Sequence, residues 1–170
     1  MAKSSGGLRY SHSKPSGDFK EFRAYSREWE KTYFDHSTGG YVVTHKERIK
    51  SGESSKQEFE KFKKEQEMCQ DLAAQGHKIE HLSDTNRKKG QTYDIHYDGK
   101  KADLKSVSSH NNVKSYVKHA VKEQGASTVI VRIEEKAKKA EVVKALHSAK
   151  NRYGGRILYY FQSDKTLREI

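Results

Sequence analysis

The sequence predicts an α/β fold with a mixed central sheet flanked by helices. From residue 56 onward, patterns typical of helices alternate with patterns typical of strands. The pair Asp98-Gly99, flanked by alternating residues, predicts a type I′ turn between two antiparallel strands. The segment STVIVRI, residues 127–133, alternates Val and Ile as a buried strand does. Helices that separate strands along the chain are typical of the α/β class.

The first 55 residues precede this succession. Residues 1–17 are polar, rich in Ser and Gly, and contain the only proline, which predicts a flexible lead or a domain boundary. Residues 18–34 predict a helix with Asp18 as N-cap, because four aromatic residues recur at helical spacing: Phe22, Tyr25, Trp29 and Tyr33. Residues 37–49 predict a turn and a short strand. The aromatic residues are expected in a core, with base stacking as the alternative, and the role of residues 18–55 stays open.

The main domain is predicted over residues 56–170, with the element order α-β-β-β-α-β-α-β. Its first helix covers about 56–75 and ends at Gly76, a natural C-cap. The other elements, in chain order, are a strand over 77–82, hairpin strands over 91–97 and 100–107, a helix over 111–124, a strand over 127–133, a helix over 135–150 and a strand over 156–161.

The composition favours a polyanionic partner. Lys and Arg number 34 against 23 Asp and Glu, which gives a formal net charge of +11. Such a balance favours nucleic acid. The single cysteine, Cys69, excludes an intramolecular disulfide, and no Cys and His spacing fits structural zinc. No apolar run approaches the length of a membrane span, and the N-terminus lacks the apolar segment of a signal peptide. We therefore expect a protein that acts in a reducing compartment, the cytoplasm, although a domain cut from a larger secreted polypeptide would look the same.

The predicted hairpin concentrates charge on one face. Its register sets Asp94 opposite Asp103, with Cβ atoms roughly 4.5–5.5 Å apart, where like charges destabilise a sheet. Lys105 projects from the same face as Asp103, because side chains alternate along a strand. A divalent cation, Mg²⁺ or Mn²⁺, would turn this repulsion into binding and would support phosphodiester hydrolysis. The alternative is an exposed hairpin whose carboxylates form ordinary surface ion pairs with Lys101 and Lys105.

A third acidic residue lies on the helix over 56–75. Glu65 falls on the apolar stripe formed by Phe62, Cys69 and Leu72. A glutamate on a buried stripe needs a partner, so Glu65 is a candidate third carboxylate of the metal site. The alternative is a boundary residue that extends outward to solvent.

This order of elements resembles the core of the PD-(D/E)xK nuclease superfamily. The motif reads Asp94, eight intervening residues, then Asp103-Leu104-Lys105, with Tyr93 in place of the proline. More narrowly, the segments EQEMCQDLAAQGHKIEHL, YDIHYDGKKADLKS and VKHAVKEQGASTVIV are similar to the C-terminal tRNase domains of contact-dependent growth-inhibition (CdiA-type) toxins. The resemblance covers about residues 56–135. It implies metal-binding roles for Glu65, Asp94 and Asp103, and it implies that Lys105 is the catalytic lysine.

Candidate substrate contacts lie on the following helix and on the loop before the hairpin. Lys114, Lys118 and Lys122 stand four residues apart and form a basic ridge able to follow a phosphate backbone. The loop over 86–90 adds Arg87 and Lys88. The resemblance implies polar substrate contacts from Lys118, Lys122 and Gln124.

The sequence therefore predicts a metal-dependent endonuclease, with RNA, and tRNA in particular, favoured as substrate by the resemblance alone. A toxin of this kind implies an acidic immunity protein as partner and delivery within a larger secreted or phage polypeptide. Two alternatives stay open. One is a DNA endonuclease of a defence system or mobile element, and the other is a noncatalytic nucleic-acid-binding or phage structural protein.

Overall fold

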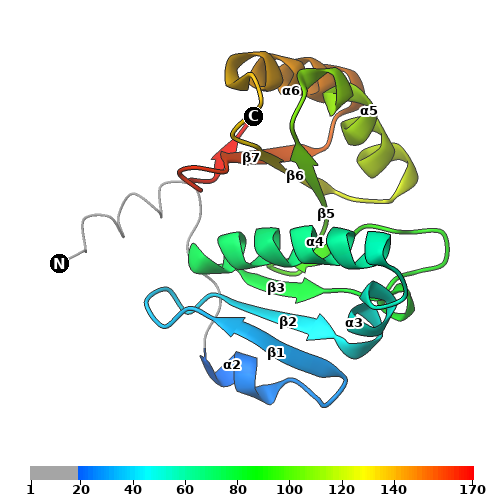
Figure 1. The fold of residues 1–170 in the computed structure, drawn as a ribbon, viewed down its shortest axis with the longest axis vertical. Coiled ribbons are helices and arrows are strands. Elements are labelled where there is room, and N and C mark those ends of the chain that lie inside the picture. The colour runs from blue at the N-terminus through cyan, green and yellow to red at the C-terminus, as the bar shows by residue number, and fades with distance from the viewer. Residues whose placement is uncertain (1–18) are drawn as a thin grey trace. The chain divides into compact units, whose positions relative to one another are not determined.

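The computed structural model of the protein describes residues 19–170 and divides into two units (Figure 1). The N-terminal unit comprises the described residues up to Lys88 together with Ile95–Gly99, and the C-terminal unit comprises Lys89–Asp94 and Lys100–Ile170. The predicted lead over 1–17 and the Asp18 cap lie outside the described residues. The division of the chain at residues 17 and 55 stays a prediction.

The predicted α/β class is confirmed: the described residues form five α-helices and eight strands of mixed direction. The elements of the N-terminal unit are α2 (Phe19–Ala24), β1 (Trp29–Phe34), β2 (Tyr41–His45), α3 (Lys46–Gly52), α4 (Lys56–Ala74), β3 (Lys78–His81) and β4 (Ile95–Tyr97). Strand β2 pairs antiparallel with β1 and parallel with β3, and β3 pairs antiparallel with β4.

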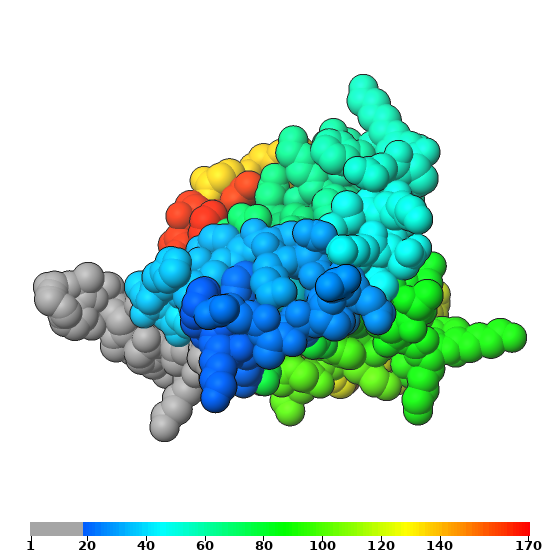
Figure 2. Space-filling view, turned by 90° about the horizontal axis from the view of Figure 1, so that it is seen from below, coloured from blue at the N-terminus to red at the C-terminus, as the bar shows by residue number. Residues whose placement is uncertain are grey.

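The predicted helix over 18–34 is wrong beyond Ala24, because Trp29 begins strand β1. Pairing of β1 with β2 along most of its length outweighs the helical spacing of the aromatic residues. The expected core role holds for three of the four aromatic residues: Phe22 is buried in a cluster with Tyr41 and Val43, and Tyr25 and Trp29 pack against this cluster, whereas Tyr33 is not part of it. Figure 2 shows the surface of this region in blue.

Strand β2 is buried on both faces. Tyr41 and Val43 point toward Phe22 of α2, whereas the side chain of Thr44, on the opposite face, contacts Gln66 of α4. Helix α4 begins at an N-cap, Ser55, whose side chain accepts a hydrogen bond from the Glu58 amide. Helix α4 therefore places Glu65 and Gln66 over the inner residues of β2 and β3.

The elements of the C-terminal unit are β5 (Lys100–Val107), α5 (Val113–Lys118), β6 (Thr128–Ile133), α6 (Lys139–Tyr153), β7 (Arg156–Phe161) and β8 (Arg168–Glu169). Strands β5, β6 and β7 are parallel neighbours, and β8 pairs antiparallel with β7. All six residues of β6 are buried, as its apolar sequence predicts. The predicted order α-β-β-β-α-β-α-β is confirmed from α4 to β7, whereas the two-residue β8 was not predicted.

The predicted helix over 111–124 is divided. A 3₁₀ turn over His110–Asn112 leads into α5, and a π-helical turn over His119–Glu123 follows it.

None of the described helices is long and apolar enough to cross a membrane.

The turn after β4 has the predicted conformation, since φ is 49° at Asp98 and 84° at Gly99. The predicted strand over 91–97 is shorter, because β4 begins only at Ile95. The amide of Asp94 donates to the Ala102 carbonyl at 3.1 Å, which is incompatible with a direct pairing of Asp94 and Asp103. The expected opposition of two carboxylates in register is therefore wrong. The repulsion between like charges at paired positions gives the physical reason.

Candidate functional site

Strand β5 holds an aspartate and a lysine side by side. Asp103 is fully buried, and its Oδ2 atom lies 2.8 Å from the Nζ atom of Lys105. The two residues are two positions apart and lie on the same face of β5, as the strand pattern predicts. Both are anchored by the pairing of β5 with β6, where Asp103 lies beside Val129 and Lys105 beside Val131.

The carboxylate of Asp103 has no hydrogen-bond donor among the described residues. The ammonium group of Lys105 lies at ion-pair distance from Oδ2, but its direction does not satisfy hydrogen-bond geometry, so the contact is electrostatic only. A buried carboxylate without donors is costly unless a cation compensates it. The site thus has the character of an oxygen ligand for a hard cation.

Asp94 reaches the same strand from the preceding segment. Its Oδ2 atom accepts a hydrogen bond of 2.8 Å from the amide of Leu104, the residue between Asp103 and Lys105. The structure therefore brings Asp94, Asp103 and Lys105 together along β5.

In the described part of the chain, no group of three His, Cys, Asp or Glu side chains gathers closely enough to hold a metal ion. A site built on Asp94 and Asp103 fits Mg²⁺ nonetheless, because Mg²⁺ keeps several waters and binds through one or two carboxylates plus substrate phosphates. The oxygens of Asp103, which accept no hydrogen bond from the described residues, support this fit.

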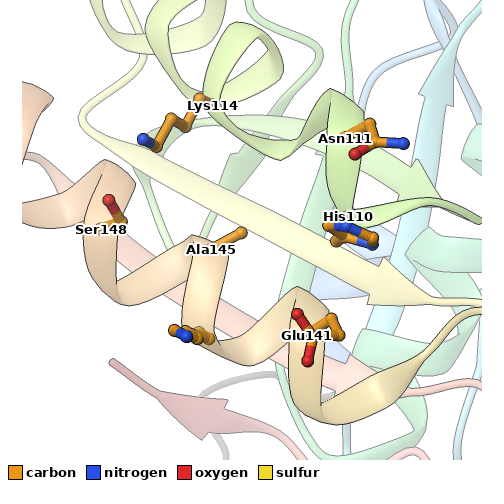
Figure 3. A pocket seen from close by; sticks show the side chains of 7 residues that line it. His110, Asn111, Lys114, Glu141, Ala145 and Ser148 are labelled. Carbon is orange, nitrogen blue, oxygen red and sulfur yellow. The ribbon is translucent and has the colours of Figure 1, made fainter.

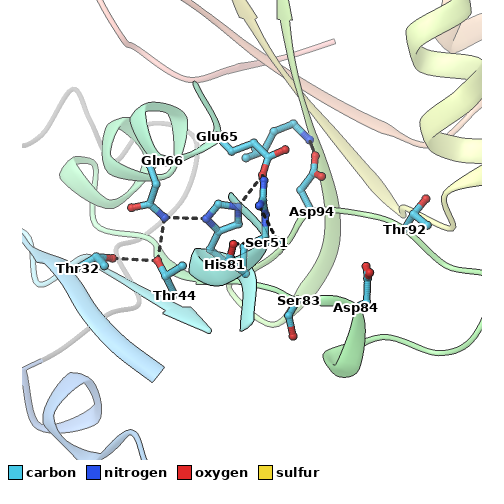
Figure 4. A network of polar contacts seen from close by, with 12 residues as sticks. Thr32, Thr44, Ser51, Glu65, Gln66, His81, Ser83, Asp84, Thr92 and Asp94 are labelled. Atoms are coloured by element: carbon cyan, nitrogen blue, oxygen red, sulfur yellow. Dashed lines mark hydrogen bonds and ion pairs between the residues drawn. The ribbon is translucent and has the colours of Figure 1, made fainter. Parts of the chain in front are cut away.

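Glu65 belongs to the N-terminal unit and lies in a buried polar network, drawn in Figure 4. Its Oε1 atom accepts hydrogen bonds from Arg48 at 2.9 Å and from His81 Nε2 at 2.7 Å. The guanidinium group of Arg48 also lies over the ring of Phe62, which stacks on the ring of His81. The glutamate on the apolar stripe therefore has partners, as its burial requires.

The direction of hydrogen bonding through this network is fixed by Gln66. Its Nε2 amide group donates to Thr44 Oγ1 at 2.8 Å and to His81 Nδ1 at 2.7 Å. Because Nδ1 accepts, the proton of a neutral His81 is on Nε2, from which it is donated to Glu65. Thr44 continues the chain through a 3.1 Å contact to Thr32 Oγ1.

The pKa values in this network agree with that assignment. Burial raises the pKa of Glu65, but the hydrogen bonds and charges of His81 and Arg48 outweigh it and lower the pKa to about 2. Burial lowers the pKa of His81, and the nearby charge of Arg48 lowers it further, while Glu65 raises it. At neutral pH, the network holds an ionised Glu65 and a neutral His81.

A second polar cluster lies on the opposite face of β3. Glu80 accepts hydrogen bonds from Tyr25 at 2.6 Å and from His96 Nδ1 at 2.8 Å. The hydrogen bond from His96 lowers the pKa of Glu80 despite partial burial. His96 therefore contacts a carboxylate of the N-terminal unit.

The basic candidates differ in exposure. Lys114 and Lys118 on α5, Lys122 in the π turn, and Lys88 are exposed, whereas the Arg87 side chain is mostly buried and pairs with Asp84. Lys114 lines a pocket of about 350 Å³ beside α6 (Figure 3). Its other lining residues are His110, Asn111, Glu141, Lys144, Ala145 and Ser148.

Gln124, another of the predicted substrate contacts, is buried as a whole residue. Its Oε1 atom accepts a hydrogen bond from Lys105 at 3.1 Å, and its Nε2 group donates to the Thr92 carbonyl at 3.2 Å. The structure thus connects Gln124 to the candidate catalytic lysine.

The sequence did not identify Arg48, Gln66 and His81 as partners of Glu65. His81 follows the alternation of β3, which places it on the inner face with Ile79, and this was the only available signal. Arg48 lies in the short helix α3, which was not predicted.

No protein-family model and no curated protein sequence matches this chain. The α/β fold has a counterpart among bacterial toxin and immunity complexes. The chain is similar to a chain of the CdiA-CT/CdiI toxin and immunity complex from Burkholderia pseudomallei, with a TM-score of 0.55 and 14% sequence identity. The match covers 69% of this chain and 89% of that chain. At this identity, the likeness concerns the fold.

Proposed function

We propose that the protein is a metal-dependent endonuclease of the PD-(D/E)xK type that hydrolyses phosphodiester bonds in RNA, with tRNA as its substrate. The observation that carries the proposal is Asp103, a fully buried carboxylate that accepts no hydrogen bond and lies next to Lys105. If Asp103 had a purely structural role, its buried negative charge would be compensated by Lys105 alone.

Asp94 and Asp103 are the residues that would hold Mg²⁺ or Mn²⁺. The bound ion would supply Lewis-acid chemistry, polarising the phosphodiester group and promoting ionisation of a water molecule. Lys105 orients the attacking water or stabilises the negative charge of the pentacovalent transition state through its ammonium group. The Oε1 atom of Gln124 accepts a hydrogen bond from that ammonium group, so the lysine is held from a second side.

The resemblance also names Glu65 as a third acidic residue of the site, and that role stays a prediction from the sequence. In the N-terminal unit, its Oε1 atom accepts two hydrogen bonds, from Arg48 and His81. The pKa of about 2 keeps this carboxylate ionised over the physiological range.

The biological role proposed is that of a toxin domain. Its support is the fold similarity to a chain of the CdiA-CT/CdiI complex, together with the net charge of +11, which suits a polyanionic substrate. We propose an acidic immunity protein as partner, since it would complement the same charge. Delivery within a larger polypeptide, with the cytoplasm as site of action, belongs to this proposal.

The test is incubation of the purified protein with total tRNA, single-stranded RNA and duplex DNA, in Mg²⁺, in Mn²⁺ and in EDTA. The Asp103→Asn variant is the control, because the amide keeps the shape of the side chain and removes its charge. We expect metal-dependent cleavage of tRNA by the wild type and none by the variant. Cleavage of duplex DNA alone would replace the RNA assignment by a DNA endonuclease. Binding without cleavage of any substrate would leave a noncatalytic nucleic-acid-binding protein.

A further inference from the structure

Gln124 contacts both parts of the candidate site within the C-terminal unit. Its side-chain Oε1 atom accepts a hydrogen bond from the Nζ atom of Lys105 at 3.1 Å. Its side-chain Nε2 group donates to the carbonyl of Thr92 at 3.2 Å. Its backbone carbonyl accepts two further hydrogen bonds, from the amides of Thr92 at 3.1 Å and Tyr93 at 3.2 Å. One residue therefore holds the lysine and the segment that leads directly into Asp94.

The π-helical turn before Gln124 accounts for its position. The Gln124 amide donates to the His119 carbonyl, five residues earlier, at 3.0 Å, so the turn contains one residue more than an α-helical turn. Gly125 then reverses the chain with φ of 79°, and a Cβ atom there would lie 3.0 Å from the side chain of Gln91. Such turns are rare and occur frequently at functional sites.

The contacts of Gln124 argue against a direct role in substrate binding. The residue is 8% exposed, and its backbone amide, backbone carbonyl, Oε1 and Nε2 groups all have partners within the protein. A substrate contact would require at least one of these hydrogen bonds to be given up inside a buried site, at the cost of an unpaired polar group.

We propose that Gln124 is a positioning residue that fixes the Lys105 ammonium group relative to the Asp94-bearing segment. This inference rests on the proposed function, because it assigns Lys105 and Asp94 to the reaction. It replaces the direct substrate contact that the sequence resemblance implied for Gln124. Misplacement of a catalytic group by about 1 Å can cost about 100-fold in rate, so a positioning residue has a measurable effect without touching the substrate.

The experiment compares Gln124→Met, which keeps the length of the side chain but makes neither hydrogen bond, with Gln124→Glu, which keeps an acceptor for Lys105 and loses the donor to Thr92. Glu123→Gln is the matched control, because Glu123 is exposed in the same turn and pairs with His119. Circular dichroism and thermal unfolding establish that each variant is folded. The readouts are kcat at saturating tRNA, the Kd for tRNA in EDTA, and the NMR signals of the Gln124 side-chain amide.

We expect Gln124→Met to lower kcat by about 10- to 100-fold with the Kd unchanged, and Gln124→Glu to retain more activity than Gln124→Met. In the wild type, the Gln124 amide signals should shift on Lys105→Met substitution but not on Glu123→Gln substitution. A raised Kd with unchanged kcat would overturn the inference and restore the direct substrate contact. Wild-type kinetics in Gln124→Met, or amide signals insensitive to Lys105, would also overturn it.

Failure of the proposed function is distinguishable from failure of this inference. If the wild type cleaves no nucleic acid, the endonuclease proposal fails and the positioning role fails with it, whereas the NMR signals still show whether Gln124 contacts Lys105. If the wild type cleaves and Gln124→Met is fully active, the endonuclease proposal stands and only the positioning role fails.

Discussion

Asp103 carries a charge into a place where the described residues provide it no hydrogen-bond donor. Its only compensation within the C-terminal unit is the ion pair with Lys105, whose side chain is 17% exposed. Removing a charge from water costs several kcal/mol unless partners repay it. At the residue scale, the protein is therefore expected to be less stable without a cation than with one.

Binding of Mg²⁺ or Mn²⁺ should raise the melting temperature of the wild type, because a ligand that binds only the folded state stabilises it. The gain is about 2.7 kcal/mol at a metal concentration of 100 times the Kd. We expect Asp103→Asn to lose this dependence and to be at least as stable as the wild type in EDTA. Differential scanning fluorimetry with and without metal measures both, with Glu135→Gln, an exposed change in the same unit, as control. A metal-dependent shift of equal size in Asp103→Asn would contradict the assignment.

The elements of the N-terminal unit are connected by the network around Glu65. Arg48 from α3, Glu65 and Gln66 from α4, and His81 from β3 meet through hydrogen bonds of 2.7–2.9 Å. Because these hydrogen bonds join side chains from all three elements, the network specifies how α3 and α4 lie on β3. Protonation of Glu65 or His81 changes the charges within the network, so the packing of these elements depends on pH.

The stability of this unit should fall toward acid pH. The pKa of Glu65 is lowered from 4.5 to about 2, so its contribution is present above pH 4.5 and is lost as the pH falls toward 2. The pKa of His81 is lowered from 6.5, so the unfolded state gains a proton first and stability begins to fall below that pH. Glu65→Gln should cost about 3 kcal/mol at pH 7, because it leaves Arg48 without its carboxylate, and the difference from wild type should shrink below pH 4.5.

Urea unfolding of the wild type and Glu65→Gln at several pH values between 7 and 3 measures this difference. The exposed Glu60→Gln on the same helix is the control, and we expect it to follow the wild type at every pH. A Glu65→Gln penalty that stays constant down to pH 3 would show that the ionisation of Glu65 does not stabilise the fold.

The molecule as a whole carries a formal net charge of +11. Binding of nucleic acid to such a protein releases counterions, so affinity falls steeply with salt concentration. Two exposed lysines, Lys114 on α5 and Lys144 on α6, line the same pocket. Glu141 is the one acidic residue among those lining it.

Lys114→Ala should weaken tRNA binding in EDTA and reduce the slope of log K against log salt by about 1, the value for one phosphate contact. Fluorescence anisotropy over a range of salt concentrations provides the slope. Lys63→Ala, an exposed change on α4, is the matched control for loss of one positive charge. Equal slopes for both variants would indicate that the net charge, and not a contact at Lys114, governs binding.

Much of the fold follows from local patterns. The limits of β5 agree with the prediction, and those of α4, β3, β6 and β7 agree to within one residue, because their periodicity, caps and turn residues lie within the elements themselves. The same alternation placed Asp103 and Lys105 on one face, and the structure confirms their contact. The segment after Ala24 was predicted incorrectly, because pairing with a strand distant in sequence outweighed the spacing of its aromatic residues.

The sequence by itself determined the α/β class, the order of the elements from residue 56 onward, the basic charge, and the aspartate and lysine that share a face of β5. Only the tertiary structure decided that Asp94 accepts the amide of Leu104, that Glu65 is held by Arg48 and His81, and that Gln124 holds Lys105. The physical reason is the range of the interactions. Periodicity and turn chemistry act between residues a few positions apart, whereas these hydrogen bonds join residues 10 to 19 positions apart that meet only after the chain has packed.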